Sequence, residues 1–216
     1  MDRKLLVAAS VQDCAFDSAV VAKVLNIEID KVEERLLRLE RDHSLVKLTD
    51  EYELADGTLT QRYRFVHMLY QNAMLKSLKA SRRAALNRAV AQTIVDLYGE
   101  RSEGMANELA TLFEEGRDYA RAAEFYRLAA QAAVRVHANQ EAILLARQGL
   151  KMVGMLPDTN DRMRHELALI VALLEPLAAT EGLTSSEFAA HYTRARDLTR
   201  QLGDSSQILL TLNLVA

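Results

Sequence analysis

Helix breakers are scarce in this chain. Its 216 residues include only 2 prolines and 8 glycines, whereas alanine, leucine, arginine and glutamate, which favour helices, are abundant. Of all residues, 50% are hydrophobic and 26% are charged, so the chain can bury a core and keep a helical surface in water. The composition therefore predicts a mainly α-helical protein with one large or two small domains.

The first 66 residues are expected to hold three short amphipathic helices and then a β-hairpin. The helix signals are an end near Asp13, a break at Asn26, and caps at Asp17 and Asp30 for the second and third helices. The hydrophobic period then changes to two over residues 45–66, and Asp56-Gly57 in its middle is a turn signal. We expect all strands of the protein within 45–66. Three helices followed by a hairpin is the order of a winged helix.

After residue 66 the pattern is helical. We expect a helix over 67–78, one capped by Ser81, and others at roughly 105–115, 118–136, 139–155, 161–179, 185–202 and 205–216. Around Gly116 and Tyr119 the sequence resembles a tetratricopeptide-repeat (TPR) unit, with small residues that let helices approach closely. Each helix pair leaves an apolar face for its neighbour, so the array should stack as a solenoid. It ends without a polar cap, which suggests a longer array.

These patterns predict two domains: a winged helix over residues 1–79 and a TPR-like helical array over 80–216. The N-terminal segment turns polar too early for a signal peptide. No stretch approaches the ~18–20 apolar residues that a membrane span needs. We therefore expect a cytoplasmic protein that makes no membrane contact.

The charge is unevenly distributed, although the net charge is only −3. Residues 57–95 contain no Asp or Glu, while acids outnumber bases on both sides of this segment. The basic residues within it are Arg62, Arg64, Lys76, Lys79, Arg82, Arg83 and Arg88. Such a belt can be a solvated helix face, or it can meet phosphates or an acidic partner.

Motifs for catalysis and metal binding are incomplete. Two glycine pairs have the spacing of a phosphate-binding loop, but neither is followed by the lysine that such a loop requires. His165-Glu166 begins the helix pattern of zinc proteases, but Leu169 stands where the second histidine should be. Cys14 is the sole cysteine and lacks a readable catalytic partner. We expect no active site, metal site or cofactor within this chain.

Residues 62–98 (RYRFVHMLYQNAMLKSLKASRRAALNRAVAQTIVDLY) resemble the segment that follows the ATPase core in bacterial STAND ATPases. These are large signal-transduction NTPases, including ATPases fused to adenylate/guanylate cyclase domains. Residues 5–46 resemble their winged helix, and residues 108–133 and 156–169 resemble their TPR-like arm. The resemblance implies an upstream ATPase domain that binds ATP and ADP, with this chain as a non-catalytic regulatory segment.

In related STAND proteins, a histidine that begins the helix after the hairpin can contact the β-phosphate of bound ADP. His67 occupies the corresponding place, although Met68 follows it where the plant-type motif has an acidic residue. The resemblance therefore implies that His67 is an ADP phosphate sensor in the full-length protein. A histidine that serves only in the core or as a helix cap is the alternative.

The function that we expect is a conformational relay, in which a protein or small-molecule inducer binds the helical array and the winged helix passes that state to the ATPase domain. One rival is a DNA-binding transcriptional regulator. The predicted third helix carries more acids than bases and the hairpin adds further acids, which makes a poor surface for DNA. The other rival is a TPR scaffold or dimerisation module.

Overall fold

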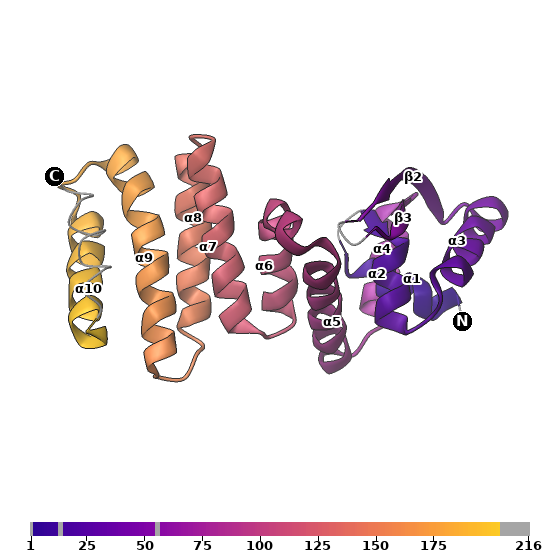
Figure 1. The fold of residues 1–216 in the computed structure, drawn as a ribbon, viewed down its shortest axis with the longest axis horizontal. Coiled ribbons are helices and arrows are strands. Elements are labelled where there is room, and N and C mark those ends of the chain that lie inside the picture. The colour runs from indigo at the N-terminus through magenta and orange to yellow at the C-terminus, as the bar shows by residue number, and fades with distance from the viewer. Residues whose placement is uncertain (1, 13–14, 55–56, 204–216) are drawn as a thin grey trace. The chain divides into compact units, whose positions relative to one another are not determined.

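The computed structural model describes residues 2–12, 15–54 and 57–203. The protein is mainly helical, with a small three-stranded antiparallel sheet (Figure 1). Four sequence-based expectations fall outside the described residues: the helix end near Asp13, any role of Cys14, the Asp56 part of the turn, and the helix at 205–216.

Two compact units divide the described residues. The first runs to Gly104 and includes Glu115–Arg117, and the second comprises Met105–Glu114 and the residues from Asp118 onward. The boundary expected between residues 79 and 80 falls within the first unit, because the helix that follows residue 79 packs on the N-terminal helices.

The first unit begins with three helices, α1 (Asp2–Ser10), α2 (Ser18–Leu25) and α3 (Ile29–His43). Asn26 ends α2 in a left-handed conformation with φ 52°, as its sequence position predicts. Helix α3 begins at Ile29, after Glu28, so the expected cap at Asp30 is wrong and Asp30 lies in the first helical turn. There its negative charge still favours the helix N-terminus.

The sheet has the order β1-β3-β2, with β1 at Ala15–Asp17, β2 at Val46–Glu53 and β3 at Leu59–Phe65. The expected hairpin is β2–β3. The expectation that strands occur only within 45–66 is wrong, because β1 pairs antiparallel with β3. Phe16 drives this pairing: it is fully buried, with ring centroids 6.1 Å from Tyr63 and 5.4 Å from Phe65.

Helices α4 (Met68–Lys76) and α5 (Ala80–Tyr98) follow the sheet, and a 3₁₀ segment, η1, spans Gly99–Met105. Ser81 does not cap α5, because that helix begins at Ala80 after Lys79. The inward residues of α5 are nevertheless those that its period predicts, since Val90, Ile94 and Leu97 are buried.

The second unit contains α6 (Ala106–Glu115), α7 (Tyr119–Arg135), α8 (Asn139–Val153), α9 (Asn160–Glu181) and α10 (Ser186–Leu202). From α7 onward each helix packs on the next one along the chain (Figure 1). Thr159 and Ser185 begin α9 and α10 with side-chain caps. The close packing requires a glycine in α8: a Cβ on Gly149 would lie 2.5 Å from Leu169 Cδ2 on α9.

Candidate functional site

No residue of helix α4 is fully buried, and the side chains at its start are exposed. It lies beside α1 and is held there by polar contacts, in which Gln71 Nε2 donates to the carbonyls of Ser10 (3.1 Å) and Gln12 (2.9 Å). Met74 adds a partly buried contact with the core of the unit. The side chains of Gln71 and Met74 therefore help to fix the position of this helix.

Large apolar side chains just before and at the start of this helix are exposed to solvent. Val66 is 53% exposed, Met68 70%, Leu69 67% and Tyr70 42%. Single exposed apolar residues are common, but a run of neighbours marks a surface that a partner covers. Together with the basic residues that follow, this run forms what we term the α4 segment, residues 64–88.

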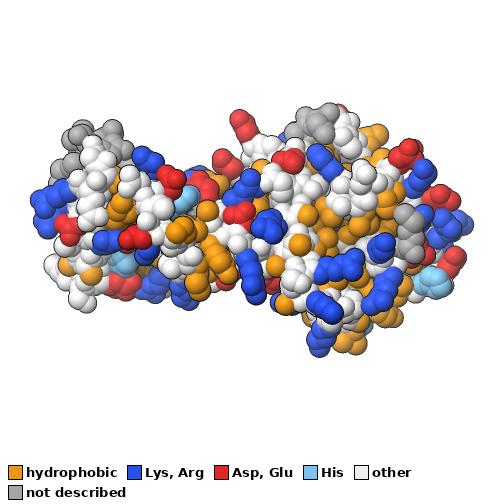
Figure 2. Space-filling view, turned by 90° about the horizontal axis from the view of Figure 1, so that it is seen from below, with side chains coloured by type: hydrophobic (Ala, Val, Ile, Leu, Met, Phe, Trp, Pro, Cys, Tyr) orange, Lys and Arg blue, Asp and Glu red, His pale blue; other side chains and the backbone are white. Residues whose placement is uncertain are grey.

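Six of the seven basic residues predicted from the charge pattern belong to the α4 segment. Arg64 lies at the end of β3, Lys76 ends α4, Lys79 is the N-cap of α5, and the last three lie on α5. All six, Arg64, Lys76, Lys79, Arg82, Arg83 and Arg88, are exposed. None forms an ion pair with a carboxylate in the part of the chain that the structure describes. Figure 2 shows basic and hydrophobic side chains interspersed on the right-hand half of the view, where the first unit lies.

His67 is exposed and occupies the N-cap of α4. Its Nδ1 accepts a hydrogen bond of 3.1 Å from the backbone N–H of Leu69, so in this arrangement the ring proton of the neutral imidazole is on Nε2. The ring contacts Tyr70 edge-on, with centroids 6.3 Å apart. The sequence left a core position or a helix cap open for His67. The core position is wrong, because the side chain is exposed, and the structure shows His67 as a cap. The cap leaves Nε2 as a donor for a phosphate oxygen.

Arg62, the seventh predicted base, has a different place. Its Nε lies 3.1 Å from Asp17 Oδ1 and its outer nitrogen 3.3 Å from Asp17 Oδ2, and its guanidinium lies over the ring of Tyr52. Its side chain is 37% exposed, whereas that of Asp17 is 2% exposed. Arg62 therefore neutralises a buried carboxylate and adds little charge to the surface.

Asp17 is the centre of a buried polar group that we term the Asp17 cluster: Asp17, Tyr52, Arg62 and Tyr98. The carboxylate does not cap α2 as expected. It accepts instead from the hydroxyl of Tyr52 at 2.7 Å and from that of Tyr98, and the two hydroxyl oxygens are 2.5 Å apart. Two hydroxyl hydrogens are thus shared among three close oxygen–oxygen contacts, Tyr52 with Asp17, Tyr98 with Asp17 and Tyr52 with Tyr98. The cluster joins β1, both strands of the hairpin and the end of α5.

Burial keeps both phenols of the Asp17 cluster protonated. It raises the pKa of Tyr52 to about 12, and the hydrogen bonds with Asp17 and Tyr98 modify this shift. The pKa of Tyr98 is raised further, first by burial and then by the hydrogen bonds with Asp17 and Tyr52. At neutral pH the two hydroxyls are therefore hydrogen-bond donors to the carboxylate.

Sequence reasoning missed this cluster. Tyr98 and Asp17 are 81 residues apart, and each has an ordinary local explanation, as the end of one helix and the cap of another. A usable signal was that Asp17 interrupts an otherwise apolar stretch. Three-dimensional pairing decides its role.

Across residues 2–12, 15–54 and 57–203, no three His, Cys, Asp or Glu side chains gather where they could hold a metal ion. None of the helices in these ranges combines the length and apolarity that crossing a membrane requires. Comparison with protein-family models, with curated proteins and with solved structures finds no significant match to this chain.

Proposed function

We propose that this chain is the non-catalytic regulatory segment of a STAND-type signalling ATPase. In this proposal the first unit is a winged helix that docks on an upstream ATPase domain through the α4 segment. The second unit is a TPR-like array that receives an inducer. The observation that carries the proposal is the α4 segment, in which exposed apolar side chains and unpaired bases precede and follow, along the sequence, a histidine with a free donor.

The composition of the α4 segment favours a partner with both apolar and acidic or phosphate groups. Covering Val66, Met68 and Leu69 would remove apolar surface from water, which stabilises a complex in proportion to the area buried. The six unpaired bases would raise the local occupancy of an anion without any base-specific contact. An ATPase domain with bound ADP offers both features, and its phosphate would accept from His67 Nε2.

The Asp17 cluster supports a relay within the first unit. Arg62 lies on β3, two residues before the α4 segment begins, and Tyr98 ends α5, the helix that leads away from the sheet. A shift of β3 would strain the contacts of Arg62 and Tyr98 with one shared carboxylate. Docking at the α4 segment would in this way alter the contacts of Tyr98 at the end of α5.

The DNA-binding alternative has less support. The exposed face of α3 carries Glu34 and Asp42 beside Arg38 and Arg41, and the exposed residues of β2 include Asp50, Glu51 and Glu53. These carboxylates would repel backbone phosphates where a recognition helix and a wing would lie. Nanomolar, sequence-specific binding at physiological salt would favour the alternative over the proposal.

The coding sequence before residue 1 is the simplest test. A phosphate-binding loop (GxxxxGK[ST]) between a strand and a helix is expected there. If the upstream sequence has no nucleotide-binding domain, the proposal is wrong.

His67 variants of the full-length protein test the phosphate contact separately from the cap. His67→Ala removes both the cap and the Nε2 donor. His67→Asp keeps a good N-cap but places a negative charge where the phosphate would bind, and His67→Asn keeps the cap and a donor. We expect ADP retained through purification to fall strongly for Ala and Asp and least for Asn, with higher basal signalling in the first two.

If His67 acts only as a helix cap, a different order of ADP retention is expected among the three variants. Losing an N-cap costs about 0.5–2 kcal/mol, and here the loss stays local because α4 buries no side chain. If His67 only caps α4, the Asp variant keeps ADP like the wild type and only Ala shows a change. That result would contradict the sensor assignment. A lower melting temperature with unchanged retention of ADP would contradict it as well.

Charge reversal tests the docking surface. Lys76→Glu with Arg82→Glu changes two exposed, unpaired bases of the α4 segment. The matched control is Arg164→Glu with Arg196→Glu, two exposed bases of the second unit with side chains 66% and 52% exposed. We expect the first pair to release ADP and raise basal ATP turnover, and the control pair to behave like the wild type. Equal effects of both pairs would contradict docking through the α4 segment.

A further inference from the structure

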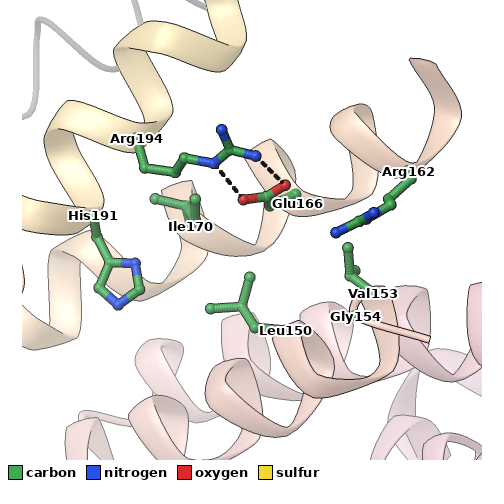
Figure 3. Close-up of a pocket in the computed structure, with 8 residues that line it drawn as sticks. All are labelled: Leu150, Val153, Gly154, Arg162, Glu166, Ile170, His191 and Arg194. Carbon is green, nitrogen blue, oxygen red and sulfur yellow. Dashed lines mark hydrogen bonds and ion pairs between the residues drawn. The ribbon is translucent and has the colours of Figure 1, made fainter. Parts of the chain in front are cut away.

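The second unit contains a pocket of about 270 Å³ formed by three consecutive helices (Figure 3). The end of α8, the first half of α9 and the middle of α10 contribute its walls. Leu150, Val153 and Ile170 make an apolar base, and Val153 and Ile170 are only 2% and 1% exposed. The pocket therefore has a fixed hydrophobic surface on which an aliphatic group can lie.

The rest of the wall is polar, and its one carboxylate is already occupied. Arg194 binds Glu166 with both arms, with Nε 2.6 Å from one carboxylate oxygen and an outer nitrogen 2.8 Å from the other, as Figure 3 shows. This fork uses both oxygens of Glu166 and neutralises its charge. It leaves the remaining outer nitrogen of Arg194 with donors to spare.

Arg162 supplies an unused buried donor on the same wall. Its Nε is buried and has no hydrogen-bond partner within the described ranges of the chain. The outer nitrogen of this guanidinium reaches only Asp158, at 3.5 Å, and the side chain of Asp158 is 89% exposed. A buried N–H of a charged group is costly to leave unpaired, so an acceptor at this point would be bound favourably.

The remaining titratable groups near the pocket do not provide that acceptor. His191 lines the pocket, and its Nε2 lies 3.7 Å from Glu187 Oε1. Glu187 is itself held by Arg147 at 2.8 Å. Arg162, Arg194 and His191 thus line a pocket whose neighbouring carboxylates, Glu166 and Glu187, are each engaged by an arginine.

We propose that this pocket binds a small aliphatic carboxylic acid as its anion. The carboxylate would accept from Arg162 Nε, and the hydrocarbon part would lie on Leu150, Val153 and Ile170. The volume is just below the usual range for small-molecule sites of ~300–1,000 Å³, which indicates an acid of roughly four to eight carbons and leaves no room for a nucleotide. Binding here does not depend on the proposed docking. If the array does receive an inducer, this acid is the class of inducer that the pocket fits.

Calorimetry on the chain tests the proposal with butanoate, hexanoate and octanoate, and with hexanamide as the uncharged isostere. We expect saturable binding of at least one acid with a Kd of about 1 mM or tighter, and at least tenfold weaker binding of hexanamide. Arg162→Gln should weaken binding of the acid about tenfold, which corresponds to the loss of one charge-assisted contact. The matched control Arg164→Gln lies on the same helix, but it pairs with Asp161 on the surface and should bind like the wild type.

Three results would overturn the proposal. These are no saturable binding of any of the three acids, hexanamide binding as well as hexanoate, or an equal loss of affinity in the Arg164→Gln control. Circular dichroism of each variant separates loss of binding from loss of fold. The calorimetry measures direct binding to this chain. Absence of acid binding would therefore not affect the ADP-retention result, and failure of the docking proposal would not affect the binding result.

Discussion

Removing the hydroxyl of Tyr98 should destabilise the first unit by about 2 kcal/mol, within the 1.5–3 kcal/mol typical of hydrogen bonds to charged groups. Tyr98 is 8% exposed, and its hydroxyl donates to Asp17, which is 2% exposed. A Tyr98→Phe variant keeps the ring and its packing but takes one donor from the buried carboxylate. The cost stays moderate because both Arg62 contacts and the Tyr52 hydroxyl still reach Asp17.

Because the two hydroxyls share their hydrogens, the stability losses of the Tyr52→Phe and Tyr98→Phe variants should not be additive. In Tyr98→Phe the hydroxyl of Tyr52 can give its hydrogen fully to Asp17, and in Tyr52→Phe that of Tyr98 can do the same. The double variant has no such compensation and leaves Asp17 with Arg62 alone. We therefore expect the double variant to lose more stability than the two single variants together, by about 0.5–1 kcal/mol.

Urea unfolding followed by circular dichroism measures these differences, with hydrogen exchange assigning them to the first unit. Tyr70→Phe is the control, because Tyr70 is 42% exposed and its change should stay within about 0.5 kcal/mol. Additive losses, or a double variant no worse than Tyr98→Phe, would refute the idea that the two hydroxyls share their hydrogens across one carboxylate.

Two further results are expected. Burial raises the pKa of Tyr52 and of Tyr63 to about 12, against 10.0 for an ordinary tyrosine. The stability that depends on neutral phenols is thus present below pH 10.0 and lost as pH rises toward 12, and urea titrations should show a shallower alkaline loss in Tyr52→Phe. Gly149→Ala should destabilise the second unit by about 1–3 kcal/mol through the contact with Leu169. In a Leu169→Ala background the cost should be smaller, because only the contact with Tyr126 Cβ at 3.1 Å remains and alanine is the better helix former.

The helices could be predicted because their signals are local. The period of buried residues and the breaks at Asn26 and Gly99 placed most helix ends within a few residues. The caps were less predictable, because α3 and α5 start one residue before the expected cap residues, Asp30 and Ser81. Cap preference identifies the right residue types near a helix start, but hydrogen bonding of neighbouring backbone decides which residue begins it.

Strand β1 and the contacts of Asp17 and Glu166 could not be predicted, because they depend on distant partners. Three residues are too few for a period-two pattern, and β1 exists because Phe16 packs between Tyr63 and Phe65. Glu166 looked like part of an incomplete zinc motif, whereas in the structure it binds Arg194, 28 residues later. In each case local spacing suggested one role and tertiary contacts gave another.

A buried charge cluster at the junction of β1, the hairpin and α5 calls for an explanation, because well-packed apolar residues would often be as stable there. We expect that replacing the whole cluster, with Asp17→Leu, Tyr52→Phe, Arg62→Met and Tyr98→Phe, leaves the stability of the chain within about 2 kcal/mol of the wild type or increases it. Arg62→Met alone should cost about 3–5 kcal/mol, since it leaves the Asp17 charge buried without its counter-ion. If the cluster exists for the relay, the fully apolar variant folds but no longer couples the array to ADP retention in the full-length protein. A fully apolar variant with normal ADP retention and normal signalling would show that the cluster only fixes the packing of α5.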